Sequence, residues 1–282
     1  MSSPPPPSAA QINADVDRAL DEDRGRGDLS ARLIARDAWA QADIIAREPG
    51  ILAGNAWAAA CFKRIDPACT VSQRRRDGDR LTQDTVILTV EGPARALLTA
   101  ERPALNFLQT LSATATATAR YVDAIQGTGV RLLDTRKTLP GLRQAQKYAV
   151  RCGGGANHRI GLFDAVLIKE NHIAAAGSVS RAVRAALAQD HGAWVEVEVE
   201  SLEQLSEALD AGAQRILLDN FPPDALRAAV TVNAGRAQLE ASGGVTLDTL
   251  RTIAETGIHA ISVGAITKDI KALDLSMRCT AS

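Results

Sequence analysis

The chain has 282 residues, of which 46% are hydrophobic, and this is enough to bury one large core or two moderate ones. Its formal net charge of -1 gives no general attraction to nucleic acids or acidic membranes, which disfavours both of those binding classes. The 4 cysteines show neither a CxxC pair nor metal-ligand spacing. We therefore expect reduced thiols rather than a disulfide scaffold or a zinc site.

The first residues form a proline- and serine-rich tract that has no basic region and no apolar run. This composition is not typical of a signal peptide, and it predicts a disordered tail over residues 1–10. No later stretch approaches the length of a membrane span. We expect a soluble, cytoplasmic protein.

Residues 11–113 mix helical and strand patterns without a regular order. Helices are predicted over residues 12–20 and 28–34, and strands over residues 41–47, 69–75 and 85–91. A long helix is predicted to start at Pro103 and to run to Tyr121, because proline suits a first helical turn and leucines recur along one face.

From residue 130 onward a unit repeats, in which a short apolar run precedes a helical pattern. The runs cover residues 130–134, 165–168, 194–199, 215–218, 238–241 and 260–263. Amphipathic helices lie between the later runs, and Ser201 followed by Gln204 predicts a capping box. This alternation favours a parallel sheet, and the lack of a dinucleotide-binding fingerprint favours a barrel over an open sheet.

Charged and polar residues stand at the ends of these runs, where an α/β barrel carries its active site. The early runs supply mostly cations and the later runs mostly carboxylates, which suits an anionic substrate beside ribose hydroxyls, a developing cation or Mg²⁺. The residues concerned are Asp134, Arg136, Lys137, Lys169, Glu196, Glu198, Glu200, Asp219, Glu240, Ser242 and Ser262.

Residues 194–200 alternate valine with glutamate, which places the two types on opposite faces of a strand. In isolation this pattern predicts an edge strand with a solvated acidic face. Within the repeat, we expect at least one glutamate to point into the barrel mouth. Gly243 and Gly264 follow late strands, where barrels bind phosphate, although a glycine there can also mark only a tight turn.

The histidines divide into two groups. His158 alone would be an ordinary surface histidine, but beside Arg159 and after a glycine run it is predicted to bind an anion. His172, His191 and His259 are expected to be structural or solvated.

Several segments together resemble the quinolinate phosphoribosyltransferase family. They are Asp-Thr-Arg-Lys-Thr at 134–138, Pro-Gly-Leu-Arg at 140–143, the run from Lys147 to Gly155, Asn-His-Arg at 157–159, Leu-Ile-Lys at 167–169, Leu-Asp-Asn at 218–220 and Glu-Ala-Ser-Gly-Gly at 240–244. The resemblance runs from about residue 20 to about residue 275. It implies an α/β sandwich over residues 11–113, to which residues 268–282 return, and an open, incomplete α/β barrel over residues 114–267.

The activity implied by the resemblance is phosphoribosyl transfer from phosphoribosyl pyrophosphate to quinolinate. Decarboxylation gives nicotinate mononucleotide, pyrophosphate and CO₂ for NAD biosynthesis, with Mg²⁺ as the cofactor. Two alternatives stay open. One is a related phosphoribosyltransferase that acts on another ring acid, such as a molybdenum-transport-associated relative. The other is a non-catalytic barrel that binds a phosphorylated metabolite.

The resemblance also implies roles for individual residues. Lys137, Lys169, Glu198 and Asp219 form the expected catalytic set, in which Glu198 and Asp219 bind Mg²⁺ and ribose hydroxyls and the two lysines contact phosphoribosyl pyrophosphate. The quinolinate carboxylates are assigned to Arg136, His158, Arg159 and Lys169. The ribose and 5-phosphate end is assigned to Glu240, Ser242, Gly243 and Gly264.

The family works as a homodimer in which an arginine of one subunit enters the site of the other, and Arg102 matches that arginine. Lys268 stands where family members often carry a histidine, and a lysine can still contact phosphate there.

Overall fold

The computed structural model describes residues 4–189 and 192–281, which divide into two compact units. The N-terminal unit comprises residues 4–119, 138–154 and 266–281, and the barrel unit comprises residues 120–137 and 155–265 within the described part of the chain. The division expected from the sequence placed residues 138–154 in the barrel instead. The difference arises from α4 (Arg143–Cys152), which buries Ala145, Tyr148 and Ala149 in the core of the N-terminal unit.

The first helix, α1 (Ala9–Arg24), begins inside the tail that was expected over residues 1–10. The side chain of Ser8 caps it by accepting a hydrogen bond from the backbone N–H of Gln11 at 3.3 Å, a signal that the sequence analysis overlooked. Residues 4–8 of the expected tail lie outside any helix or strand, and residues 1–3 lie outside the described residues.

An antiparallel sheet with the order β12-β1-β5-β3 forms one layer of the N-terminal unit. Its strands are β1 (Trp39–Ala46), β3 (Thr70–Gln73), β5 (Val86–Pro93) and β12 (Leu275–Ala281). The predicted strands over residues 41–47, 69–75 and 85–91 are therefore confirmed, with small shifts at their ends. A two-stranded ladder joins β2 (Gly50–Ile51) to β4 (Arg80–Leu81).

Helices α2 (Asn55–Ile65) and α3 (Ala94–Ala124) contribute to the core of this unit. The predicted start of α3 at Pro103 was wrong, because the helix begins at Ala94 and Pro103 lies inside it. An interior proline disrupts the helical hydrogen bonds. Pro103, Ala104 and Leu105 are all buried, however, and tertiary packing here outweighs that local preference. Residues 28–34 form only a short 3₁₀ helix, η1 (Ser30–Leu33).

The side chain of Asp77 connects three segments of the N-terminal unit through hydrogen bonds. Its carboxylate accepts hydrogen bonds from the backbone N–H groups of Gly54 and Asn55 at the start of α2, at 3.1 and 3.2 Å. It also accepts one from the hydroxyl of Tyr148 on α4, at 2.7 Å. Because Gly54 offers no side chain, Asp77 caps α2 from outside the helix. Burial raises the pKa of Asp77 above its ordinary value, while these hydrogen bonds oppose the shift.

We predict that Asp77→Ala lowers the free energy of unfolding by about 2–4 kcal/mol, because it leaves buried donors unsatisfied and removes the cap of α2. Denaturant unfolding would measure the change. Asp79→Ala is a suitable control, since Asp79 accepts a hydrogen bond from Arg76 on an exposed turn. Equal losses in the two variants would contradict this account.

A parallel sheet with the order β6-β11-β10-β9-β8-β7 forms the barrel unit. Its strands are β6 (Arg131–Leu133), β7 (Ala165–Ile168), β8 (Trp194–Val199), β9 (Arg215–Asp219), β10 (Gln238–Ser242) and β11 (Ala260–Ser262). Every strand predicted in this region is confirmed. Strands β6 and β7 stand at opposite ends of the sheet order, so the barrel is incomplete among the described residues.

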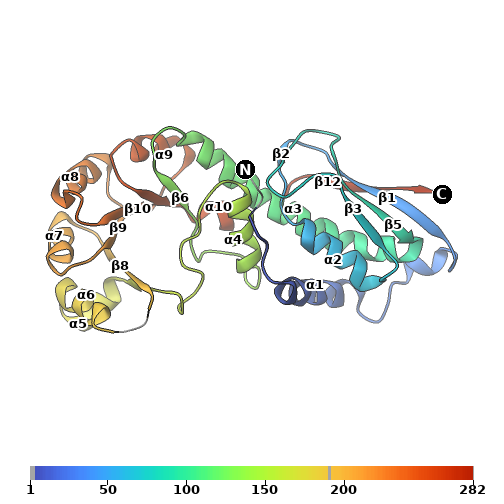
Figure 1. The fold of residues 1–282 in the computed structure, drawn as a ribbon, viewed down its shortest axis with the longest axis horizontal. Helices are drawn as coiled ribbons and strands as arrows, with labels where there is room; N and C mark the ends of the chain where they lie inside the picture. Colours follow the sequence, from blue (N-terminus) through green and yellow to red (C-terminus); the bar gives the residue numbers. More distant parts are fainter. Residues whose placement is uncertain (1–3, 190–191, 282) are drawn as a thin grey trace. The chain divides into compact units, whose positions relative to one another are not determined.

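Helices follow the strands along the outer side of this curved sheet (Figure 1). They are α5 (Glu170–Ala176), α6 (Val179–Leu187), α7 (Leu202–Asp210), α8 (Pro223–Asn233), α9 (Leu247–Ala254) and the short α10 (Ala265–Lys268), which ends in the N-terminal unit. The predicted capping box at α7 is half present. Ser201 accepts from the N–H of Gln204, but the Gln204 side chain accepts from the N–H of Glu200.

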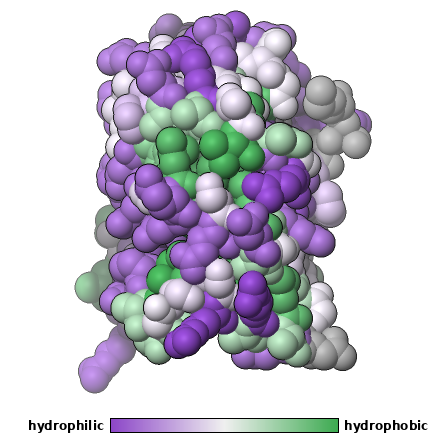
Figure 2. Space-filling model, turned by 90° about the vertical axis from the view of Figure 1, so that its left-hand side faces the viewer, coloured by the Kyte–Doolittle hydropathy of each residue, from purple (hydrophilic) through white to green (hydrophobic). Residues whose placement is uncertain are grey.

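The face on the left of Figure 1 is mostly hydrophilic, with apolar side chains gathered in small clusters (Figure 2). Among the described helices, none is both long and apolar enough to cross a membrane.

Candidate active site

A cavity of about 350 Å³ opens at the carboxyl ends of the barrel strands. It collects most of the predicted site residues, because parallel strands end at one rim. Its lining consists of Asp134, Thr135, Arg136, Lys137, His158, Arg159, Leu167, Lys169, Glu198, Leu217, Glu240, Ser242 and Ser262.

Strand β8 has the two faces that its sequence predicts. Val197 and Val199 are fully buried, while Glu198 lines the cavity. The side chain of Glu196 is buried within hydrogen-bond distance of His158. Glu200 is exposed beyond the strand end. The expectation that at least one glutamate points into the mouth is therefore confirmed.

The cationic side of the cavity contains Arg136 and Arg159. The guanidinium of Arg159 is buried and donates a hydrogen bond to the carbonyl oxygen of Ala165 at 3.3 Å. Burial, together with the nearby charge of Arg136, lowers the pKa of Arg159 below its ordinary value. Two neighbouring guanidiniums in a partly desolvated cavity favour a ligand that carries negative charge.

Lys169 and Glu198 form an ion pair across the cavity, with 2.7 Å between Nζ and Oε2. The lysine side chain is 44% exposed, so the pair contributes little to stability. Both charged groups line the cavity, where they can contact a bound ligand. The N–H of Lys169 donates to Nδ1 of His172 at 3.0 Å, and His259 accepts from the N–H of Leu239. His172 and His259 are therefore structural, and His191 lies outside the described residues.

Asp134 fixes the segment that carries His158 and Arg159. It is fully buried directly after β6, where it accepts hydrogen bonds from Asn157 Nδ2 at 2.6 Å and from the N–H of His158 at 2.9 Å. Sequence reasoning grouped Asp134 with the chemical residues of the strand ends. Its contacts show a positioning role instead.

Both ring nitrogens of His158 have protein partners. Nδ1 accepts a hydrogen bond from the N–H of Arg159 at 2.8 Å, and Nε2 lies 2.8 Å from a carboxylate oxygen of Glu196. The expected role of His158 as a ligand of the quinolinate carboxylates stays a prediction, and its ring would have to exchange one of these contacts to bind an anion directly. The partnership with Glu196 was not visible in the sequence, where only the alternation of β8 hinted at an inward glutamate.

Glu240 lies beside this pair, with Oε2 at 3.6 Å from His158 Nε2. The residue is 4% exposed, and its Oε1 atom has no hydrogen-bond partner. Burial, followed by the charge of Glu196, raises the pKa of Glu240 to about 7. The ligand atoms of His158, Glu196 and Glu240 lie within 4.8 Å of one another, a spacing that could also suit a metal ion.

A tight turn after β9 forms the side of the site to which β9 and β10 contribute. Asn220 has a φ of 58° and donates its backbone N–H to the carbonyl oxygen of Ser242, and its side chain donates to Asp219 at 2.7 Å. A Cβ atom at Gly243 would lie 2.1 Å from Oδ1 of Asn220. Burial raises the pKa of Asp219, while Lys169 and Lys137 oppose the shift. Close packing at Gly243 therefore holds the Asp219 turn.

We predict that Gly243→Ala lowers the free energy of unfolding by about 2–4 kcal/mol, because it combines a strained φ of 95° with a clash against Asn220. Activity should fall with it, because the turn that carries Asp219 is displaced. The matched control is Gly244→Ala, where φ is also positive but no atom lies within 4 Å of the added Cβ. Thermal unfolding and steady-state rates of both variants would check the prediction.

Five of the residues to which the family resemblance gives a role do not line the cavity. Asp219 and Gly243 form the adjacent turn, and a Cβ at Gly264 would approach Lys137 Cδ to 3.0 Å, so these three lie beside it. Lys268 and Arg102 belong to the N-terminal unit. Lys268 pairs with Asp269 at 2.6 Å, and Arg102 is exposed on α3.

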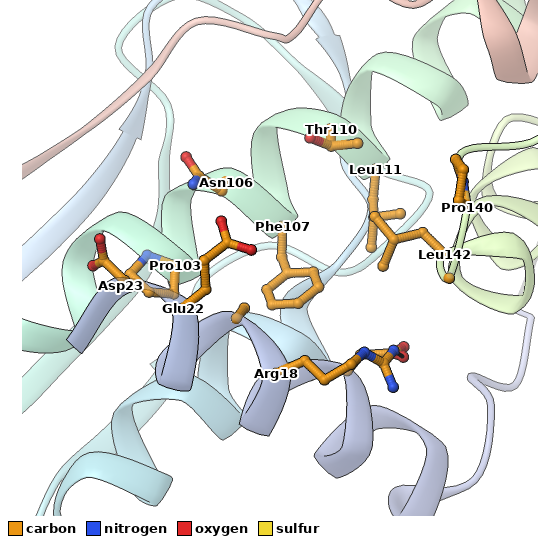
Figure 3. A pocket seen from close by; sticks show the side chains of 13 residues that line it. Arg18, Glu22, Asp23, Pro103, Asn106, Phe107, Thr110, Leu111, Pro140 and Leu142 are labelled. Carbon is orange, nitrogen blue, oxygen red and sulfur yellow. Dashed lines mark hydrogen bonds and ion pairs between the residues drawn. The ribbon is translucent and has the colours of Figure 1, made fainter. Parts of the chain in front are cut away.

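The N-terminal unit has a second cavity, of about 310 Å³, between α1, α3 and the residues before α4 (Figure 3). Phe107 and Leu111 give it an apolar side, and Arg18 on α1 is paired with Asp15 at 2.6 Å. Glu22 and Asp23 add negative charge. No predicted site residue lines it, and its acidic character does not suit an anionic substrate.

The geometry of the barrel cavity thus defines a class: an α/β-barrel site for an anionic ligand, with carboxylates placed for hydroxyl groups or a divalent cation. Comparisons with known proteins specify that class. The C-terminal domain of quinolinate phosphoribosyl transferase matches residues 114–278, and the N-terminal domain of the same family matches residues 28–112. The chain belongs to the quinolinate phosphoribosyl transferase family and is an enzyme of the phosphoribosyltransferase class.

Individual relatives agree over nearly the whole length. The chain is 44% identical over 262 residues to a probable nicotinate-nucleotide pyrophosphorylase (carboxylating) of Bacillus subtilis, covering 93% of this chain and 91% of that protein. It is 43% identical to the corresponding enzyme of Mycobacterium leprae, covering 93% and 95%. A solved nicotinate-nucleotide pyrophosphorylase of Francisella tularensis superposes with a TM-score of 0.93 at 45% identity, covering 96% of each chain.

Proposed function

We propose that this chain transfers the phosphoribosyl group of phosphoribosyl pyrophosphate to the ring nitrogen of quinolinate. Loss of the adjacent carboxylate as CO₂ then gives nicotinate mononucleotide. The observation that carries the proposal is a single cavity that sets Arg136, Arg159 and two lysines against Glu198. A doubly acidic ring and a polyanionic sugar phosphate need such a set of cations, while the carboxylate of Glu198 suits a sugar with cationic character.

The quinolinate end of the cavity is assigned to Arg136 and Arg159. A guanidinium can donate two parallel hydrogen bonds to a carboxylate, and this geometry suits a dicarboxylate better than a single ammonium group does. The lowered pKa of Arg159 supports the assignment, because an incoming anion would relieve the repulsion from Arg136.

The phosphoribosyl pyrophosphate end is assigned to Lys137, Lys169, Glu198 and Asp219. The last two residues are carboxylates near the ends of neighbouring strands β8 and β9, and carboxylate oxygens fit Mg²⁺. When bound there, Mg²⁺ would neutralise charge on the departing pyrophosphate. The lysines neutralise the same group, and the carboxylates favour the positive charge that develops on the ribose in the transition state.

The chain's own residues mainly position and desolvate the two substrates, so no covalent nucleophile is required. Incubation of the purified protein with quinolinate, phosphoribosyl pyrophosphate and Mg²⁺ should release CO₂ and pyrophosphate in equal amounts. Nicotinate, tested side by side, should react far more slowly, because it lacks one carboxylate. Faster turnover of nicotinate would favour the related phosphoribosyltransferase, and binding without pyrophosphate release would favour a non-catalytic barrel.

We predict that Arg159→Ala weakens quinolinate binding roughly 30-fold or more, the loss expected for charge-assisted hydrogen bonds, and changes phosphoribosyl pyrophosphate binding far less. Calorimetric titration with each ligand would measure both effects. Arg227→Ala is the control, because Arg227 lies on α8 and pairs only locally with Asp224. Equal losses for the two ligands would contradict the assignment of Arg159.

We further propose a homodimer in which Arg102 of one subunit completes the site of the other. The exposure of Arg102 on α3 supports this arrangement. Mixing inactive Arg102→Ala and Lys169→Ala subunits should restore about a quarter of the activity, because half of the random dimers regain one intact site. Sedimentation would report the oligomer. A mixture that stays inactive, although its subunits exchange, would contradict the shared site.

A further inference from the structure

Two buried glutamates, Glu196 and Glu240, meet the partly buried side chain of His158 at the lining of the cavity. His158 Nε2 lies 2.8 Å from Glu196 and 3.6 Å from Glu240. Glu196 is 3% exposed and Glu240 4% exposed, so water screens neither carboxyl group. We call His158, Glu196 and Glu240 the His158 cluster. Two of its members carry acidic groups, and its net charge depends on how many protons the cluster holds.

The hydrogen bonds of His158 fix its protonation. Nδ1 accepts from the backbone N–H of Arg159 at 2.8 Å, so Nδ1 carries no proton. The imidazole is then neutral, with its one proton on Nε2, where it is donated to Glu196. The same geometry disfavours a metal ion in the cluster, because a metal ligand needs a lone pair on Nε2.

A neutral imidazole cannot balance two buried carboxylates. Burial and the charge of Glu196 on β8 raise the pKa of Glu240, whereas His158, Ser262 on β11 and Arg215 on β9 lower it, and burial is the largest of these effects. Like charges at this separation disfavour double ionisation, so one of the two carboxyl groups retains a proton. Glu196 already accepts from His158 at short range. Glu240, with its unpartnered Oε1 and its place in the cavity lining, is the acid.

Glu240 lines the cavity, and its Oε2 lies 3.6 Å from Nε2 of His158, the residue that directly precedes Arg159. Because Arg159 is assigned to quinolinate, we place the carboxyl group of Glu240 on the quinolinate side. This differs from the ribose-end position that the family resemblance implied for Glu240.

The proposed reaction requires a proton on this side. When the bond between ring carbon 2 and its carboxylate breaks, CO₂ departs and the electron pair stays on carbon 2, beside the cationic ring nitrogen. That pair must take up a proton to give nicotinate mononucleotide. Lys137 and Lys169 line the same cavity, but an ammonium group is a weaker acid than a carboxylic acid. The raised pKa of Glu240 keeps a proton available near neutral pH.

We propose that Glu240 is a neutral carboxylic acid that donates the proton which replaces the departing carboxylate of quinolinate. The donation leaves Glu240 as a carboxylate, which water reprotonates after the product leaves. This inference rests on the proposed function, but it concerns the step after pyrophosphate has left, so the two can fail separately.

The test uses Glu240→Gln in the full-length protein, because glutamine keeps the shape but has no transferable proton. In a single turnover, pyrophosphate release should stay within about threefold of the wild type, while nicotinate mononucleotide formation falls about 100-fold, the usual share of a general acid. Quinolinate mononucleotide should accumulate. Glu203→Gln, an exposed change on α7, is the control and should alter neither rate.

Equal loss of both rates, or loss of neither, would overturn the proposal, as would a metal ion that the wild type retains and Glu240→Gln lacks. Failure of pyrophosphate release in the wild type would instead refute the proposed function. If Glu240→Gln does not fold, Glu240→Asp provides the same comparison, with a smaller but still selective loss of the second step.

Stability gives a readout that is independent of activity. The folded protein holds a proton on Glu240 between the ordinary pKa of 4.5 and about 7, where the unfolded chain has lost it. Stability attributable to this group therefore falls as pH rises through that window. Glu240→Gln should lack this decline in denaturant unfolding between pH 5 and pH 8. An identical pH dependence in wild type and variant would show that Glu240 is not a neutral acid.

Discussion

The site depends on the buried carboxylate of Asp134. Its two hydrogen bonds to Asn157 and His158 hold a non-strand segment against the end of β6, at the open edge of the barrel. Ala156 forms a parallel bridge with Leu133, so this segment continues the sheet for one residue pair where no strand follows. Without this segment, the outer edge of β6 would be exposed to solvent. The segment covers that edge in place of a further strand, and it positions His158 and Arg159 at the site.

Much of the barrel could be predicted from the sequence, because its strands are short apolar runs and their ends carry polar residues. The glutamates of β8 illustrate why this works: a period of two fixes which side chains face the interior, whatever the rest of the fold does. The resemblance to a known family added expected roles for Arg136, Lys169 and Glu198, which spacing alone does not give.

Other features depend on tertiary contacts that no local pattern reveals. Pro103 was predicted to start the helix, because proline suits a first helical turn. Only the surrounding core shows that a proline is tolerated inside this helix. Residues 138–154 looked like part of the barrel, but the buried face of α4 finds its partners in the other unit. The contact between His158 and Glu196 could not be predicted either, because Glu196 lies on a strand far along the chain.

The path of the chain through α4 has a consequence for the barrel site. The barrel segment that precedes it in the chain carries Arg136 and Lys137, and the barrel segment that follows it carries His158 and Arg159. The backbone therefore passes from one cationic segment to the other through a helix that folds with the N-terminal unit. Glu196, Glu198 and Glu240 instead belong to strands whose connecting helices fold within the barrel unit.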